Sequence, residues 1–203
     1  NSSLKATLDS SGNLGLGVTP KAWTVFNSIL EYPSGALASY TNETYLFNNS
    51  AFYTSAYRYL QSAAAGYYLQ GGGAHKWYRS TDASPTAGNA ITFTQAMTLD
   101  ASGRLGIGTA SPSEKLHAYG SGNIYALAES STAGNAGFRF KNNTQDWYLL
   151  TDSTGAASFY DNTGSTTRLT LTASGNLGLG VTPVSTLSGY RAFDIGSGGQ
   201  LYS

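Results

Sequence analysis

The chain has 203 residues, with 11 Lys and Arg against 11 Asp and Glu, and only 11% of its residues are charged. It therefore lacks the basic surplus of a nucleic-acid-binding protein, and no apolar run approaches the roughly 20 residues of a membrane helix. The absence of cysteine excludes a disulfide framework, a thiolate metal site and a cysteine nucleophile.

Short strands are predicted along almost the whole chain, because apolar and polar residues alternate over short runs between turn residues. In chain order, the predicted strands are 14–18, 23–26, 37–46, 53–60, 67–69, 75–78, 91–99, 115–119, 124–128, 138–140, 147–150, 157–160 and 168–171. Clusters of Pro, Gly, Asn and Asp separate them. Residues 61–65 are the only helix-leaning stretch, so the sequence predicts an all-β fold of short antiparallel strands.

One phrase, which we name the Leu-Gly repeat, occurs three times. Its copies begin at Leu8 (LDSSGNLGLGVTP), Leu99 (LDASGRLGIGT) and Leu171 (LTASGNLGLGVTP). The glycine that follows Ser should supply a positive φ for a tight hairpin, at Gly12, Gly103 and Gly175. Because the copies are unevenly spaced, they punctuate larger blocks and do not indicate a solenoid of short equal repeats.

The second half of the Leu-Gly repeat alternates leucine and glycine with period two. In the first copy, this alternation predicts Leu14, Leu16 and Val18 on one face of a strand, with glycine on the other. The predicted structural glycines are Gly15, Gly17, Gly106, Gly108, Gly178 and Gly180. A bare glycine face suits the close approach of another backbone, and we expect that backbone to come from an identical chain.

The repeats divide the chain into tandem modules joined by Gly-rich β-hairpin linkers. We expect a linker at 1–20 that ends a preceding module, an aromatic-rich β module at 21–98 and a second linker at 99–114. A second β module at 115–170 and a third linker at 171–183 follow. Residues 184–203 are predicted to begin a further module of the first type, because 193–203 echo 29–39.

The sequence resembles the tail fibres of tailed phages and related virion appendages. The resemblance rests on the segment from Met97 to His117, on Trp23, 48–49, 67–68, 73–78 and 87–93 in the first block, and on 115–117, 137–142, Trp147 and 159–162 in the second. It implies an elongated homotrimeric fibre in the virion, and we expect no cofactor, metal or catalytic activity. This piece would be a shaft or mid-fibre module that supports adsorption to the host, with other tail or baseplate proteins as partners.

Catalytic signatures are sparse in this sequence. Gly15-Leu16-Gly17 lacks the third glycine of a dinucleotide loop, and His75 and His117 have no carboxylate at a metal-ligand spacing. Acids such as Asp9 and Asp100 stand in predicted turns. Two alternatives stay open: a tailspike-like enzyme that cuts polysaccharide with two distant carboxylates, and a bacterial surface adhesin with the same repeats.

Aromatic side chains crowd the first block, and they allow two interpretations. They can form a platform for carbohydrate, or they can pack across strands and between subunits, which we favour. His75, Trp77 and Tyr78 are the candidate contacts for a host surface glycan. Short blocks with few charges bury little core alone, so a threefold assembly that covers their apolar faces is the central expectation.

Overall fold

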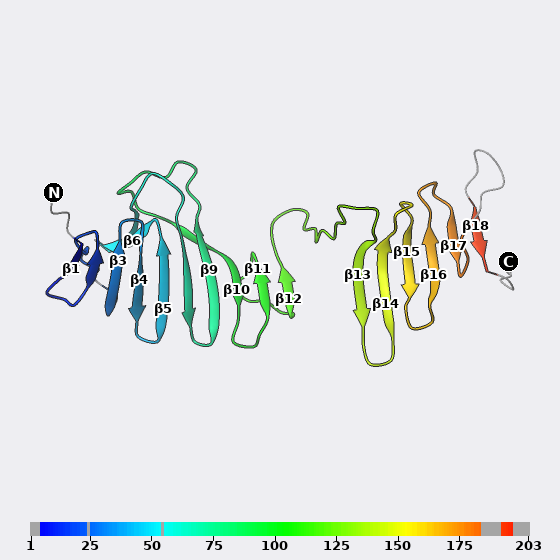
Figure 1. Ribbon diagram of the computed structural model, residues 1–203, viewed down its shortest axis with the longest axis horizontal. Helices are drawn as coiled ribbons and strands as arrows, with labels where there is room; N and C mark the ends of the chain where they lie inside the picture. Colours follow the sequence, from blue (N-terminus) through cyan, green and yellow to red (C-terminus); the bar gives the residue numbers. More distant parts are fainter. Residues whose placement is uncertain (1–4, 24, 54, 184–191, 197–203) are drawn as a thin grey trace. The chain divides into compact units, whose positions relative to one another are not determined.

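The computed structural model describes residues 5–23, 25–53, 55–183 and 192–196. These residues form strands and turns and no helix, which confirms the all-β prediction. Within them, no helix is long and apolar enough to cross a membrane. The chain separates into two compact units, Asn1–Ile124 and Tyr125–Ser203, and Figure 1 shows the strands side by side within each.

The first unit contains a ten-stranded sheet whose strands are neighbours in the order β1-β2-β3-β4-β5-β8-β9-β10-β11-β12. Their bounds are Ala6–Leu8 (β1), Leu14–Leu16 (β2), Ser28–Tyr32 (β3), Gly35–Tyr40 (β4), Glu43–Asn48 (β5), Gly66–Gly71 (β8), Ala74–Ser80 (β9), Phe93–Leu99 (β10), Leu105–Ile107 (β11) and Leu116–Ala118 (β12). The sheet therefore follows the chain order except where β6 (Ser50–Tyr53) and β7 (Ala56–Tyr59) leave it as a separate pair.

The second unit contains a six-stranded sheet in consecutive order. Its strands are Ala136–Lys141 (β13), Asp146–Thr151 (β14), Ala157–Asp161 (β15), Thr166–Leu171 (β16), Leu177–Leu179 (β17) and Phe193–Ile195 (β18). The first five pair antiparallel, and β18 pairs parallel with β17. Among the described residues, both clusters of buried apolar side chains lie in the first unit, so the second sheet has no comparable core.

The core of the first unit lies on one face of its sheet. Phe47 is fully buried there, and residues of β6 and β7 pack against the same cluster. The Tyr67 and Tyr78 rings stack with centroids 4.3 Å apart, and Tyr67 meets Phe93 edge to face. Such ring pairs stabilise a core beyond the area they bury, so this face is closed by the chain itself.

A buried carboxylate fixes the segment that enters the core. Glu31 on β3 is fully buried and accepts hydrogen bonds from the Lys21 backbone N–H at 2.8 Å and the Lys21 ammonium at 2.7 Å. The Trp23 indole N–H donates to the same carboxylate at 2.9 Å. These bonds hold Trp23 over Phe47, with ring centroids 5.4 Å apart.

Several predicted strands are wrong. Of the predicted strand 23–26, the described residues 23, 25 and 26 form no strand, because Trp23 is tied to Glu31; the strand lies instead at Ser28–Tyr32, which was missed. The predicted strand 37–46 is two strands around a turn at Thr41, which has φ of +51°. Residues 124–128 form no strand, and their large side chains are exposed. The helix-leaning stretch 61–65 is not helical.

All three Leu-Gly repeats adopt the same local arrangement. Each places two antiparallel strands around a tight turn, followed by a third strand that pairs parallel with the second, as in Leu14 with Leu30 and Leu177 with Phe193. The turn glycines have positive φ, at +84° for Gly12, +69° for Gly103 and +84° for Gly175. Side-chain oxygens of Asp9, Asp100 and Thr172 accept backbone hydrogen bonds across the turns.

The predicted glycine face is wrong in its detail. The second strand ends at Leu16, because Gly17 has φ of +70°, and Gly108 and Gly180 do the same in the other copies. The chain then folds back over the remaining glycine: a Cβ on Gly15 would lie 2.2 Å from the Val18 carbonyl oxygen and 2.8 Å from Cδ of Pro20. The close backbone belongs to the same chain, so these glycines need no second copy.

Because the chain folds back in this way, alanine substitutions at the two glycines of the third repeat should destabilise the protein to different extents. A Cβ on Gly178 would lie 2.2 Å from the Val181 carbonyl oxygen, whereas one on Gly180 meets no atom of the described residues within 4 Å. We expect Gly178→Ala to lower the free energy of unfolding by about 3 kcal/mol, and Gly180→Ala by about 1 kcal/mol through its positive φ alone. Urea unfolding of both variants measures the difference, and equal losses would contradict the fold-back.

The tyrosine core predicts a loss of stability at alkaline pH. Burial raises the pKa of Tyr45 and Tyr67 above the ordinary value of 10.0. Because the unfolded chain ionises first, the stabilisation is complete below about pH 10 and is lost as the pH rises through the folded values. Tyrosinate absorbance and circular dichroism, followed together, should show these tyrosines ionising as the first unit unfolds. Ionisation of Tyr45 and Tyr67 near pH 10 in the folded protein would contradict this prediction.

Candidate functional site

The face of the first sheet opposite the core carries a continuous row of apolar side chains. Residues paired in register point to the same face, so each pair extends the row by one strand. The pairs link Leu8, Leu14, Leu30, Leu37, Leu46, Tyr68, Trp77, Met97 and Ile107 across nine strands. We call this set the first apolar row.

The first apolar row is open in the single chain. Leu37 is 43% exposed, Leu46 is 49% exposed and Ile107 is 48% exposed. A single exposed leucine is ordinary, but a contiguous exposed apolar patch marks an interaction surface. Leu30 and Leu37 also line a shallow hollow of about 390 Å³ together with Ser28, Ser39 and Thr44. We therefore take this face as the main candidate site.

The second sheet carries a matching row. Register pairs join Phe138, Leu149, Phe159, Leu169 and Leu179, which are between 37% and 50% exposed. We call this set the second apolar row. Since the second unit has no buried apolar cluster among its described residues, this row holds much of its apolar surface and is uncovered.

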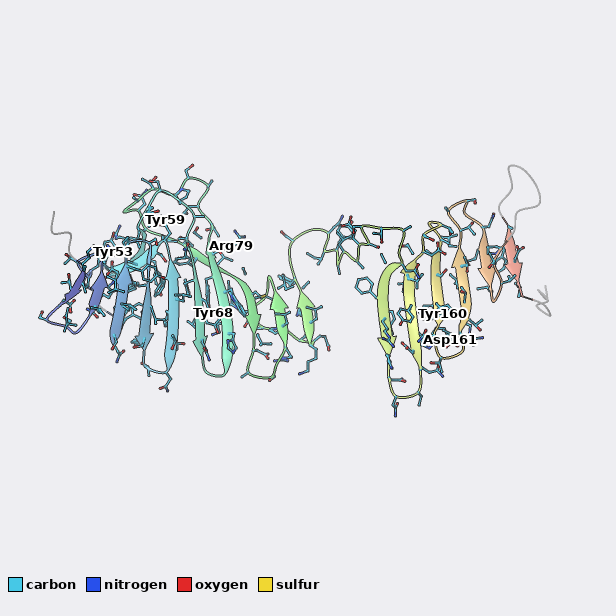
Figure 2. All side chains as sticks on the ribbon, viewed as in Figure 1. Tyr53, Tyr59, Tyr68, Arg79, Tyr160 and Asp161 are labelled. Carbon is cyan, nitrogen blue, oxygen red and sulfur yellow. The ribbon has the colours of Figure 1, made fainter. Side chains whose placement is uncertain are left out.

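The three predicted glycan contacts do not share a face. His75 and Trp77 lie on the open face with Tyr68, whose hydroxyl is hydrogen-bonded to the His75 ring and whose ring centroid is 5.3 Å from that of Trp77. Tyr78 points to the covered face, where it stacks on Tyr67 and donates to Gln95 at 2.9 Å. Figure 2 labels Tyr68 on β8. One patch can therefore contain His75 and Trp77 but not Tyr78.

Several carboxylates of the chain are engaged by neighbouring side chains. Asp146 receives two hydrogen bonds from Arg139, and this contact lowers its pKa to about 2. Asp161 pairs with Arg168 at 2.7 Å, and Asp82 accepts from the buried Tyr59 hydroxyl at 2.5 Å. Within the described ranges, no group of three or more His, Asp or Glu side chains is placed to hold a metal ion.

Sequence reasoning missed most residues of the two apolar rows. Leu37 and Leu46 were assigned to one long strand, so their direct pairing was not anticipated. The alternation of Phe138 and Phe140 with Arg139, and of Phe159 with Ser158, was a usable signal for one apolar face. It does not reveal whether that face is covered, because covering depends on segments far away in the sequence.

A scan against protein-family models finds no match for this chain, and a search of the curated proteins finds none either.

Proposed function

We propose that this chain is a structural module of a homotrimeric fibre, in the shaft or middle of a phage tail fibre or a similar virion appendage. Its role there is mechanical: it supports host-surface recognition and adsorption and performs no turnover. The observation that carries the proposal is the pair of open apolar rows, which identical chains would cover. The likeness of the Leu-Gly repeats to those of tail fibres supplies the virion context.

Burial of the two apolar rows against other copies of the chain would lower the free energy. Each partly exposed leucine or phenylalanine gains on the order of 1 kcal/mol when its remaining surface leaves water. Several such residues lie side by side in each sheet, so the gain accumulates along the rows. Around a threefold axis, each row can contact two neighbouring copies, which covers more surface than one partner does.

Charge is also compatible with self-association. The strand positions around the first apolar row are mainly Ser, Thr and apolar residues, with Arg79 at the margin as a charged exception (Figure 2). Identical faces meet without strong repulsion only where charge is low, since like charges oppose association. The net charge of zero fits the same requirement.

Sedimentation equilibrium of the full chain tests the proposal. The expected mass is three times the chain mass of 21.2 kDa. A single-chain mass at every concentration would overturn the proposed fibre. A stable two-chain mass would reject the threefold arrangement.

A further inference from the structure

The two faces of the second sheet carry different kinds of side chain. The second apolar row occupies one face, whereas Arg139, Tyr148 and Tyr160 share the other, because Tyr148 is the register partner of both other residues. Figure 2 labels Tyr160 on β15. This polar face is opposite the surface that we propose to be covered, so it stays accessible in a single chain and in an assembly.

A shallow groove opens on the polar face. Its larger hollow, of about 400 Å³, is lined by Asn135, Gly137, Tyr148, Leu150, Tyr160 and Asn162. An adjoining hollow of about 180 Å³ shares Asn135, Leu150 and Tyr160 and adds Asp152, Ser158 and Thr167. The size and the mixture of rings, amides and hydroxyls suit a small polar ligand with apolar faces.

Two tyrosines form the platform of this groove. The Tyr148 and Tyr160 ring centroids lie 6.4 Å apart, with the rings tilted by 49°, and both side chains are half-buried. The Arg139 guanidinium lies 5.4 Å from the Tyr148 ring centroid and packs against that ring. Neither tyrosine hydroxyl makes a hydrogen bond within the described part of the chain. Each tyrosine therefore offers a ring face and a hydroxyl to a ligand.

The charged side chains at the rim of the groove already have partners. The Arg139 guanidinium donates to both Asp146 carboxylate oxygens, at 2.8 and 2.6 Å, and the Asn162 amide donates to the same carboxylate at 2.8 Å. The Asp152 carboxylate in the adjoining hollow accepts hydrogen bonds from the Thr154 hydroxyl and from the backbone N–H groups of Thr154 and Ala156. Because the guanidinium is already engaged by a carboxylate, an anionic ligand gains little there, and a neutral ligand is favoured.

We propose that this groove binds a neutral oligosaccharide. A sugar ring presents C–H groups on its faces, which pack on tyrosine rings, and hydroxyls around its edge. The amides of Asn135 and Asn162 carry both donors and acceptors and can serve such hydroxyls. All of these residues belong to one chain, so the proposal holds or fails independently of the proposed trimer.

The test is a glycan array that displays neutral and anionic oligosaccharides, probed with the full chain and followed by calorimetric titration of the best glycan. We expect binding to neutral glycans and at least a tenfold loss of affinity in Tyr160→Ala, because a packed ring is removed. Asn135→Ala, at an exposed site, should weaken binding with unchanged circular dichroism. Tyr119→Ala is the matched control, since this tyrosine is 66% exposed and lies outside the groove.

Three results would overturn the proposal. They are the absence of binding to any neutral glycan, a clear preference for anionic glycans, and equal affinity in the wild type, Tyr160→Ala and Asn135→Ala. Tyr160→Phe separates folding from binding, because it keeps the ring and removes only the hydroxyl. It should retain most of the affinity, and a loss equal to that of Tyr160→Ala would contradict ring packing as the source of binding.

Discussion

The double variant Leu37→Asp and Leu46→Asp should behave as a single chain in solution. These leucines are direct register partners near the middle of the first apolar row, and both are more than 40% exposed. Enclosing two unpaired carboxylates between copies costs several kcal/mol, which lowers the association constant by at least about a thousandfold. Light scattering over a concentration series measures the mass.

The matched control is Leu127→Asp. Leu127 is 82% exposed, lies outside every strand and belongs to neither apolar row, so a carboxylate added there should leave the mass unchanged. If the double variant keeps the wild-type mass, the first apolar row is not the surface that joins the copies. If Leu127→Asp also dissociates the assembly, net charge alone explains the effect.

Glu31→Ala should lower the free energy of unfolding of the first unit by about 3 kcal/mol or more. The substitution removes the acceptor of three hydrogen bonds, leaves the Trp23 indole N–H without its partner and opens a cavity beneath it. Urea unfolding, followed by hydrogen exchange of amides in β3 and β4, isolates the effect in this unit.

Glu31→Gln is the control for this variant. It keeps an oxygen acceptor for Trp23 and a similar volume while it removes the negative charge. We expect a smaller loss than in Glu31→Ala, with Trp23 still packed on Phe47. If Glu31→Ala unfolds at the wild-type urea concentration, the carboxylate does not hold Trp23 in the core.

The fold class followed from the sequence because period-two alternation and turn residues act locally. The strands at 67–69, 75–78, 147–150 and 157–160 lie within observed strands for this reason. A strand was also predicted at 23–26, yet the described residues 23, 25 and 26 form none, because the contact of Trp23 with Glu31, eight residues further along the chain, overrides local propensity. A lone acid between Leu30 and Tyr32 was the signal for that contact.

The candidate sites were harder to predict than the fold. The glycine spacing of the Leu-Gly repeat was visible, but the positive φ of Gly17 turns the chain back onto Gly15 and replaces the expected second chain. In the proposed assembly, the leucines beside these glycines would therefore contact the other copies, and the glycines would not. Which face of the first sheet stays open depends on where the β6–β7 pair packs, and no local sequence pattern predicts this.

The central claim is that the apolar rows face other copies of this chain, and a nitroxide label tests it most directly. Because the chain has no cysteine, Thr44→Cys can be labelled alone, and Thr44 is an exposed polar position beside Leu46 on the open face. Sheets pack about 10 Å apart, so labels on adjoining copies should lie close together. Dipolar spectroscopy should show a short distance between chains with the modulation depth of three coupled spins. No dipolar coupling in concentrated protein would contradict the account.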